Sequence, residues 1–299
     1  MPSDRPRARY EPGEARTAYL FLAPVVGAIA LFVLVPVAGT LYTSLFHDVS
    51  YMERAFVGLD NYRAMFESEP FRGAVGFTLL LTATTVALEM AFGTAFAVLL
   101  SERFPGRGVL RAIILIPWAI PTIVSAQTWK LIFQYTYGIL NVLLTDLGLA
   151  ADKINWLGTP ASAFWALVVA EVWKTTPFVV LIVLAGLQAI PQEVIRQAKV
   201  DGAGMLTRFR RITLPLLRPV LVIALVFRTI DSLRIFDLVY VLTGGGPGGA
   251  TKTLSVLGFN YFTDDRFGMG SAVSVATFLI AFAITLVYIR VGRFRETIG

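Results

Sequence analysis

Residues 190–219 read IPQEVIRQAKVDGAGMLTRFRRITLPLLRP and separate two long apolar stretches. Pro191 suits the first turn of a helix, and the helix formers after it predict a short helix that stops at Asp201-Gly202. A second short helix is predicted over 204–212, and two prolines then mark the entry into the next apolar stretch. The segment therefore predicts two short helices joined by a tight turn, with apolar side chains at Val194, Ile195, Ala198, Val200, Met205, Leu206, Phe209 and Ile212.

The flanking stretches are two of six long apolar runs, at 18–46, 73–100, 109–135, 161–190, 220–242 and 271–289. Each reaches the roughly 20 residues needed to cross the hydrocarbon core of a bilayer. Only 15% of the residues are charged, whereas a soluble domain averages about 25%. Because backbone groups in lipid must bond internally, the runs predict helices. The sequence therefore predicts an all-α, polytopic membrane protein with six transmembrane helices.

Prolines interrupt three of these runs, at Pro24, Pro36, Pro117, Pro121 and Pro177. Each proline removes a backbone donor and predicts a kink. Neighbouring helices in a membrane can satisfy the carbonyl that loses its partner. Ordinary irregularity of packing is the alternative interpretation at each site.

Lys and Arg residues are distributed unevenly between alternate connecting segments. With the N-terminus inside, the inside segments hold 16 of them and the outside segments hold six. Cytoplasmic segments of membrane proteins carry such an excess. We therefore expect a multi-pass protein of the cell membrane with both termini cytoplasmic. Its parts would be tails at 1–17 and 291–299 and a transmembrane domain over 18–290, whose 191–219 loop lies on the cytoplasmic side.

The composition excludes several kinds of site. The chain has no cysteine and a single histidine, His47, which excludes disulfides, thiolate metal sites and sites with several histidine ligands. No carboxylate pair, Ser/His/Asp arrangement or metal-ligand cluster stands out, so we expect no catalytic residue, metal or cofactor in this chain. The net charge of +6 follows the membrane orientation, and we therefore expect no nucleic-acid partner.

Two outside segments have features of their own. The run GGGPGGATKT at 244–253 superficially resembles a phosphate-binding loop. It lacks the required spacing before Lys252 and a preceding strand, so we expect a flexible turn that contacts a binding protein. Residues 138–149 predict a short amphipathic helix at the membrane interface, for which contact with lipid and contact with protein are both open.

The 191–219 loop resembles the EAA loop of binding-protein-dependent ABC importer permeases. That pattern is roughly Glu-Ala-Ala, three residues, Gly, and nine residues to Ile-x-Leu-Pro. Here Gln197-Ala198-Lys199 is placed in the first part, Asp201-Gly202-Ala203 follows, and Ile212-Thr213-Leu214-Pro215 closes it. The family's acidic residue is then Gln197. The resemblance implies that the loop docks an ATPase, with contact residues Gln197, Ala198, Asp201, Gly202, Ala203, Phe209, Leu214 and Pro215. A basic loop that only follows the charge rule does not explain this composite motif.

The resemblance extends over most of the chain and is similar to the carbohydrate branch, in the maltose, trehalose and glycerol-phosphate group. The segments FVGLDNY (56–62), EVWKTTP (171–177) and FDLVYVLTGGGP (236–247) support it, and the last two resemble the trehalose-importing permeases of actinobacteria. It implies the MetI-like fold of type I importer permeases. It also implies a transport subunit without its own ATPase site, forming half of the path for a disaccharide such as trehalose or maltose by alternating access.

The resemblance also implies partners: a second homologous permease, a dimer of cytoplasmic ABC ATPases that holds ATP and Mg, an extracytoplasmic sugar-binding protein and membrane lipid. Other interpretations are a permease for a non-sugar solute such as glycerol phosphate, and a membrane scaffold or receptor without transport. A third is an ion-coupled secondary transporter that uses the charged fifth helix, although the inverted repeats common in such folds are absent.

Eight ionisable residues fall within or near the apolar runs: Glu89, Lys130, Glu171, Lys174, Arg228, Asp231, Arg234 and Asp237. Charges are costly in lipid, so each is expected to face a cavity, a partner or the bundle interior. The i,i+3 spacing allows Glu171 to pair with Lys174. Charges of alternating sign recur at every third residue over 228–237, so adjacent members can pair, while Glu89 and Lys130 are expected to be structural.

Some of these groups are candidates for a polar translocation path. Sugar hydroxyls are recognised by planar bidentate groups and by aromatic faces. The candidates are Glu171, Trp173, Lys174, Asp231, Arg234, Asp237 and Tyr240. The alternative for these residues is a set of salt bridges between helices or with a partner subunit.

Overall fold

The computed structural model describes residues 12–102 and 104–292, and helices dominate this part of the chain. Its only strands are β1 (Phe46–His47) and β2 (Ala55–Phe56), which pair antiparallel in an outer loop. Five helical segments are long and apolar enough to cross a membrane: Arg16–Thr43, Glu69–Ser101, Pro160–Ala189, Met205–Leu233 and Phe267–Arg290. The expected all-α membrane fold is confirmed.

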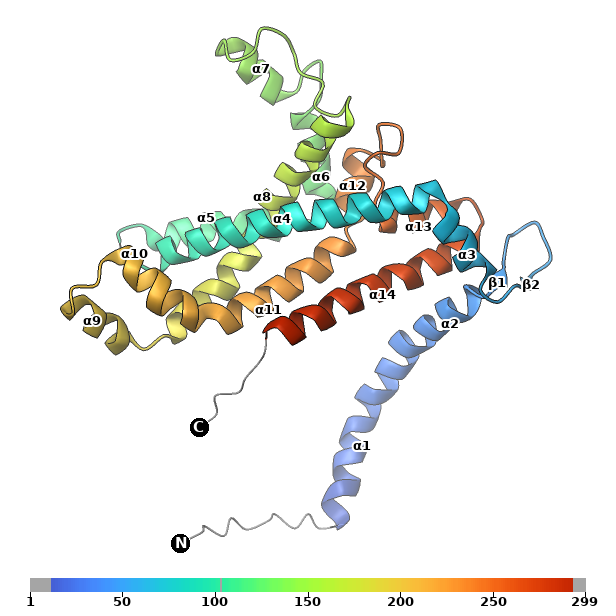
Figure 1. The fold of residues 1–299 in the computed structure, drawn as a ribbon, viewed down its shortest axis with the longest axis horizontal. Coiled ribbons are helices and arrows are strands. Elements are labelled where there is room, and N and C mark those ends of the chain that lie inside the picture. The colour runs from blue at the N-terminus through green and yellow to red at the C-terminus, as the bar shows by residue number, and fades with distance from the viewer. Residues whose placement is uncertain (1–11, 103, 293–299) are drawn as a thin grey trace.

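Four long helices form the bundle in Figure 1: α4 (Glu69–Ser101), α8 (Pro160–Ala189), α11 (Leu214–Leu233) and α14 (Phe267–Gly292). Both α4 and α8 begin with caps. The Ser68 hydroxyl accepts from the Phe71 amide, and Thr159 and Ser162 cap each other's backbone. Such caps satisfy amides that lack a partner within the helix. Gly93 allows α4 to approach α8 closely, because a side chain there would collide with Val179.

The third apolar run, predicted over 109–135, is not one continuous helix, although its two halves together are long and apolar enough for a sixth span. It forms α5 (Arg107–Ala119) and α6 (Thr122–Ile132), which are bent by 94°. Ile120 between them is extended, as the residue before a proline prefers to be. Lys174 of α8 donates to the Ile120 carbonyl at 2.6 Å. The break is therefore stabilised by a neighbouring helix, whereas Pro117 and Pro177 lie inside α5 and α8.

The fifth span ends earlier than predicted, at Leu233 rather than 242. The chain turns after it and forms the separate short helix α12 (Asp237–Leu242). At its start, α10 (Met205–Arg208) and a π-helical turn, η2 (Phe209–Thr213), run directly into α11. The expected second short helix of the 191–219 loop is thus the first part of the span. Pro215 directly follows the π-helical turn, and the helical segment continues through it.

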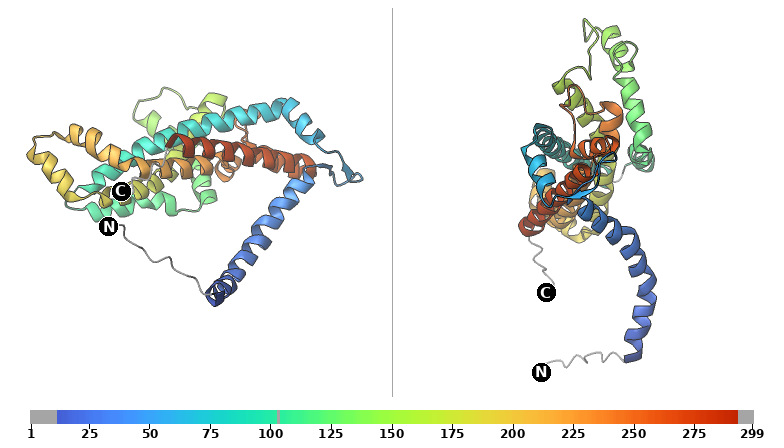
Figure 2. Two further views of the ribbon diagram at one scale, coloured as in Figure 1. Left: turned by 60° about the horizontal axis from the view of Figure 1, so that its bottom comes forward. Right: turned by 90° about the vertical axis from the view of Figure 1, so that its right-hand side faces the viewer.

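The first span leaves the bundle as an arm, seen in Figures 1 and 2. It consists of α1 (Pro12–Ile29), the π-helical turn η1 (Ala30–Leu34) and α2 (Val35–Thr43). No residue in its most apolar window is buried by the rest of the described chain. The arm begins six residues before the predicted 18. The rest of the expected tail at 1–17 and residues 293–299 of the other tail lie outside the described residues.

Shorter helices lie around the bundle. They are α3 (Asp60–Glu67) and α13 (Leu254–Thr263) at one end and α9 (Gln192–Val200) at the other, while α7 (Ile139–Asp146) projects away from the bundle (Figure 1). The helix predicted within 138–149 is confirmed as α7. The glycine-rich run is a folded loop rather than the expected flexible turn. In it the buried Thr251 hydroxyl donates to Gly246 O at 2.6 Å and also lies 2.8 Å from the Thr243 hydroxyl.

Candidate functional site

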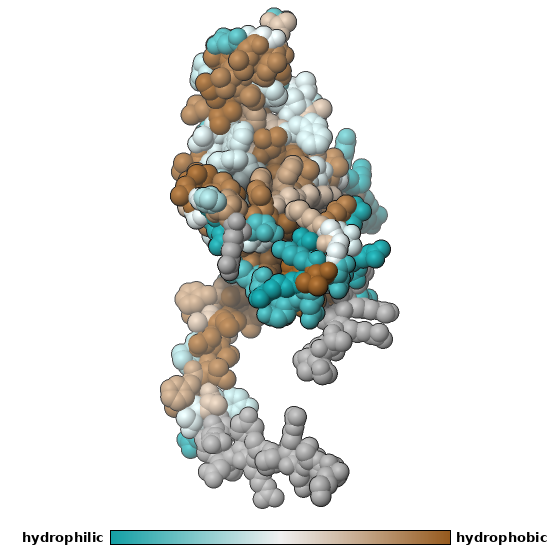
Figure 3. Space-filling view, turned by 90° about the vertical axis from the view of Figure 1, so that its left-hand side faces the viewer, coloured by the Kyte–Doolittle hydropathy of each residue, from teal (hydrophilic) through white to brown (hydrophobic). Residues whose placement is uncertain are grey.

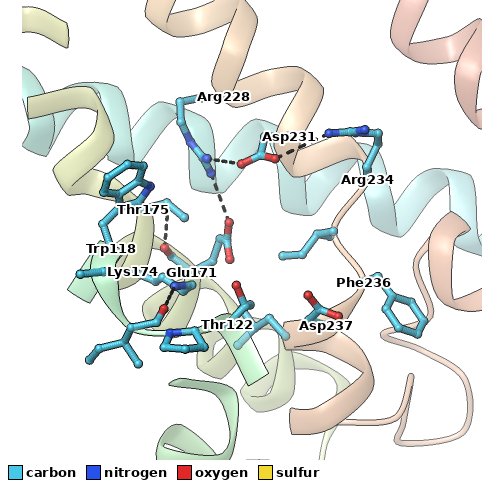
Figure 4. Close-up of a pocket in the computed structure, with 15 residues that line it drawn as sticks. Trp118, Thr122, Glu171, Lys174, Thr175, Arg228, Asp231, Arg234, Phe236 and Asp237 are labelled. Atoms are coloured by element: carbon cyan, nitrogen blue, oxygen red, sulfur yellow. Dashed lines mark hydrogen bonds and ion pairs between the residues drawn. The ribbon is translucent and has the colours of Figure 1, made fainter. Parts of the chain in front are cut away.

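A cavity of about 510 Å³ opens where two elements of the bundle are interrupted (Figure 4). One interruption is the bend between α5 and α6, and the other is the turn between α11 and α12. Non-helical backbone at membrane depth occurs where it lines a cavity or is buried in protein. The lining combines both breaks with the unbroken α8: Trp118, Ala119, Ile120, Pro121, Thr122, Glu171, Lys174, Thr175, Arg228, Asp231, Arg234, Ile235, Phe236, Asp237 and Leu238.

Arg228 of α11 lines the cavity and is the centre of an ionic cluster. Its Nε donates to Glu89 Oε2 of α4 at 2.6 Å, and its Nη2 lies 3.2 Å from Glu171 Oε1 of α8. Its Nη1 donates to Asp231 Oδ2 at 2.7 Å. The Arg228 and Glu89 side chains are 3% and 0% exposed, whereas that of Asp231 is 59% exposed. One guanidinium thus joins three helices and leaves one of its carboxylates open to the cavity.

Glu89 is held from a second side, because the Thr175 hydroxyl donates to its Oε1 at 2.8 Å. Glu89 itself does not line the cavity. It therefore fixes Arg228 from behind. Removing one partner of a buried ion pair is strongly destabilising, since it leaves a buried charge uncompensated. The geometry makes this part of the cavity wall rigid.

Five of the seven predicted path residues line the cavity, namely Glu171, Lys174, Asp231, Arg234 and Asp237. Trp173 and Tyr240 do not. Trp173 packs edge-on against Trp129 at 5.6 Å, and Tyr240 stacks on Phe236 at 5.1 Å. At about 100° per residue, Trp173 lies on the opposite face of α8 from Glu171.

The pairing predicted for Glu171 and Lys174 is not formed. Lys174 donates to the Ile120 carbonyl, and Glu171 instead meets Arg228. In the charged row, Arg228 pairs with Asp231, and Arg234 approaches Asp231 at 3.9 Å. Asp237 makes no ion pair with a described residue and begins α12. Arg228 and Thr175 were not among the predicted path residues, and the contacts of Glu89 with both side chains were not predicted either.

The charges of the lining are balanced. Three carboxylates (Glu171, Asp231, Asp237) face three cations (Lys174, Arg228, Arg234), and Glu89 stands behind them. Arg228 is held by three carboxylates, whereas Lys174 donates to one carbonyl and keeps two further N–H donors. Within residues 12–102 and 104–292 no group of three His, Asp or Glu residues is arranged to hold a metal ion.

A second cavity of about 400 Å³ adjoins the first and shares Arg234 and Phe236 with it. Phe259 and Phe262 of α13 form an aromatic side, and hydroxyl groups of α13 and α14 face them. Phe236 and Phe259 lie 5.0 Å apart. The two cavities together offer a polar wall next to an aromatic one.

The 191–219 loop folds around a tight turn between α9 and α10. Gly202 takes a φ of +77°, and the Ala203 amide donates to Ala198 O at 2.9 Å. The Arg208 guanidinium donates to Ala203 O at 2.7 Å. The left-handed backbone explains the glycine, because other residues are strained there. The turn fixes the direction in which α9 leaves the bundle.

The apolar residues of this loop divide into two sets. Ala198 is buried and Ile195 packs on the cluster formed by the ends of α4, α8 and α11. Val200, Met205 and Leu206 are exposed, Val200 by 87%. Figure 3 views this end of the molecule, where hydrophilic side chains surround smaller apolar areas. Of the other predicted contact residues, Gln197, Asp201 and Pro215 are exposed, while Ala203, Phe209 and Leu214 are half-buried.

The spacing of the EAA pattern corrects one assignment in this loop. Three residues before Gly202 are 199–201, so the Glu-Ala-Ala part falls on Arg196-Gln197-Ala198. The family's acidic position is therefore taken by Arg196, not by Gln197. Arg196 lies on the exposed side of α9, where its Nη2 is 3.4 Å from Glu193 Oε1. The charge at this position is reversed rather than neutral.

Comparison with known proteins gives a consistent result. Residues 72–295 match the family described as "Binding-protein-dependent transport system inner membrane component". The chain is 52% identical to the trehalose/maltose transport system permease protein MalF of Thermococcus litoralis, covering 95% of this chain and 96% of the relative. It is 39% identical to the sulfoquinovosyl glycerol permease SmoG of Agrobacterium fabrum (95% and 92%) and 36% identical to the trehalose permease SugA of Mycobacterium tuberculosis (93% and 89%).

The fold is also found in a solved structure. A chain of a bacterial alginate ABC transporter, in complex with alginate pentasaccharide-bound periplasmic protein, superposes with a TM-score of 0.83. The match covers 94% of this chain and 95% of the other at 22% sequence identity. At this identity the likeness concerns the fold alone, which is that of an ABC importer permease.

Proposed function

This chain belongs to the family of binding-protein-dependent transport system inner membrane components, and we propose that it forms half of the path for a neutral disaccharide of the trehalose or maltose class. The observation that carries the proposal is the cavity at the two helix breaks. Its volume of about 510 Å³ is within the range of small-molecule sites, about 300–1,000 Å³. The names of the relatives MalF and SugA support the choice of sugar.

The charges of the cavity support a neutral substrate. A phosphate or sulfonate needs a cation that is free to bind it. Arg228 is already held by three carboxylates. The other two cations of the lining, Lys174 and Arg234, are matched in number by Asp231 and Asp237, so the lining has no excess of positive charge for an anion. Sugar hydroxyls can instead donate to Asp231 and Asp237 and accept from Arg234. Glycerol phosphate and sulfonated sugars therefore fit this cavity less well than trehalose or maltose.

We propose that the 191–219 loop docks a cytoplasmic ATPase dimer, which binds ATP and Mg while this chain holds no cofactor. The excess of Lys and Arg on the loop side supports its cytoplasmic position and that of both termini. Exposed Val200, Met205 and Leu206 form the apolar centre of the contact, with basic residues around them.

The route from the loop to the cavity is short. Residues 205–233 form one continuous helical segment that begins at the docking turn and ends at the cavity. The same segment carries Arg228 and Asp231. Movement of α9 by the closing ATPases would therefore tilt the cavity wall without unfolding any element. This rigid link is how we propose that ATP use alternates access to the two sides.

Three further partners follow from the proposal. The arm α1–η1–α2 exposes an apolar surface beside the bundle, which suits contact with lipid and with a second homologous permease that completes the path. An extracytoplasmic sugar-binding protein would deliver the sugar at the opposite end from the 191–219 loop. An ion-coupled secondary transporter and a scaffold without transport do not suit a family of binding-protein-dependent components.

The test is to purify the chain with its neighbouring subunits, reconstitute them in proteoliposomes and screen sugars on the cognate binding protein. We expect an ATPase to co-purify, and trehalose or maltose uptake to require both ATP and the binding protein. Uptake of glycerol phosphate and of sulfoquinovosyl glycerol should be much lower. Uptake without ATP would overturn the importer, and preferred uptake of an anion would overturn only the substrate.

A further inference from the structure

The short outer helix α7 exposes an apolar face that nothing in the described chain covers. Ile139, Val142 and Leu143 lie on one face by helical spacing, and Leu147 follows one turn later. All four side chains are exposed. In Figure 1, α7 projects from the bundle, and the corresponding uppermost part of Figure 3 is largely apolar. A contiguous apolar surface of this kind indicates an interaction site.

The face is presented by a rigid element. Asn141, on the opposite side of α7, is buried and has four hydrogen bonds. Its amide donates to Tyr135 O at 3.1 Å and to Ile154 O at 3.0 Å, while its oxygen accepts from the Ile154 amide at 3.1 Å and from Trp156 Nε1 at 3.0 Å. One side chain therefore joins α7 to the segments on both sides of it. The apolar face has a fixed position relative to the bundle.

That position is close to the outer end of a span. Trp156, bonded to Asn141, lies four residues before Pro160, where the 30-residue span α8 begins. As a span in the proposed orientation, α8 begins at the extracytoplasmic surface of the cell membrane. The helix α7 is therefore held near this surface. Tyr135 and Tyr137 are exposed beside it. Tyrosine and tryptophan at the ends of spans are typical of the interfacial belt of a membrane.

We propose that α7 lies in the interface on the extracytoplasmic side of the cell membrane, with Ile139, Val142, Leu143 and Leu147 in contact with lipid chains. Interfacial helices place an apolar face at the boundary between headgroups and acyl chains. The chemistry of the face argues against a binding protein as its occupant. Energetically important residues at protein interfaces are enriched in Trp, Tyr and Arg, whereas Leu and Val are under-represented. The four residues are aliphatic without exception.

The contact does not depend on anionic lipid. Interfacial helices that select anionic lipid carry several Lys or Arg residues on their polar side. Near α7 the exposed charges are Asp146, which ends the helix one turn after Leu143 at the edge of the apolar face, and Asp152 and Lys153 in the loop after it. The Lys153 ammonium donates to Thr136 O at 2.6 Å. No positive patch results. The inference uses the proposed orientation of the chain but not the identity of its sugar.

The absence of native cysteine allows a direct test on the assembled importer. A spin label is attached to Leu143→Cys, and to Asp152→Cys as an exposed control in the neighbouring polar loop. Collision of each label with oxygen, which enters lipid, is compared with collision with a water-soluble nickel complex in nanodiscs. We expect the oxygen-to-nickel ratio to be several-fold higher at Leu143 than at Asp152. Adding the binding protein or phosphatidylglycerol should not change it.

Two outcomes would overturn the inference. A label at Leu143 that meets the nickel complex freely, and is protected only when the binding protein is added, would assign the face to that protein. A label that meets neither reagent would assign it to another permease subunit. If the Leu143 variant fails to assemble, Val142→Cys places the label on the same face. Because the measurement needs no transport, its failure would leave the proposed function intact, and a wrong sugar would leave the lipid contact intact.

Discussion

The cavity wall and the 191–219 loop differ in polarity and in exposure. Around Arg228 the wall is ionic, buried and complete, since every partner of the guanidinium comes from this chain. The loop is apolar and open, since Val200, Met205 and Leu206 face away from the bundle. A region that is complete within one chain holds a fixed shape. A region that is left exposed needs another chain to cover it.

The two regions are joined by one helical segment, so a movement of the loop can be transmitted to the cavity wall. Residues 205–233 start at the open region and end in the complete one. Docking forces applied at the loop therefore reach Arg228 through a continuous helix. Changes in the wall should affect the fold and transport, whereas changes in the loop should affect docking of the partner and the uptake that depends on it while the permease stays folded.

The largest effect is expected for Arg228→Met. It leaves Glu89 and Glu171 buried without a cation, which costs about 3–5 kcal/mol. Thermal unfolding of the purified complex should show the loss, and sugar uptake should disappear. Arg234→Met is the control, because an exposed pair such as that with Asp231 contributes about 0–1 kcal/mol. Adding Glu89→Gln to Arg228→Met should recover part of the stability. Equal unfolding temperatures for the two single variants would contradict the buried cluster.

Met205→Glu should weaken the ATPase contact while the permease stays folded. Met205 is exposed at the first position of α10, where an acidic residue suits a helix. Loss of an apolar contact residue costs about 1–2 kcal/mol, close to a tenfold change in affinity. The matched control is Met52→Glu in the outer loop. The amount of ATPase that co-purifies is the readout, and equal retention by both variants would place the docking surface elsewhere.

Gly202→Ala should have a smaller effect on ATP-driven uptake, because it alters only the turn that sets the orientation of α9. A side chain there would meet nothing within 4 Å. The φ of +77° nevertheless costs a residue other than glycine about 1–2 kcal/mol. Gly204→Ala is the control, since Gly204 also has open space and a φ of −64°. ATP-driven uptake should fall for the first variant and not for the second, and a reversed order would show that the turn does not set the coupling.

The smallest effect is expected for Arg196→Glu. Arg196 is exposed at the position that is acidic in the EAA pattern, so we expect its ATPase partner to offer a carboxylate. Reversing the charge should weaken docking by about 0.2–1 kcal/mol, and the effect should vanish at high salt. Gln197→Glu, the neighbouring exposed position, is the control. Tighter docking of Arg196→Glu at low salt would mean that the ATPase retains a basic site.

The sequence allowed prediction of the spans, the fold and the loop because these depend on local patterns. It did not distinguish Pro121, which breaks a span, from Pro117 and Pro177, which do not. The difference lies in Lys174, which reaches the Ile120 carbonyl from another helix. Glu89 and Arg228 are 139 residues apart, and no local spacing predicts such a pair. Trp173 does not line the cavity, because helical geometry places it opposite Glu171 on α8.

The most direct test of the central claim is sugar transport by Asp231→Asn in proteoliposomes of the assembled importer. Asp231 lines the cavity and is the most exposed carboxylate of the Arg228 cluster, with its side chain 59% exposed. The change removes its charge and one acceptor and leaves the 191–219 loop untouched. We predict that uptake of the disaccharide falls while the ATPase subunits remain bound at wild-type levels. Unchanged uptake at normal expression would contradict a substrate role for this cavity.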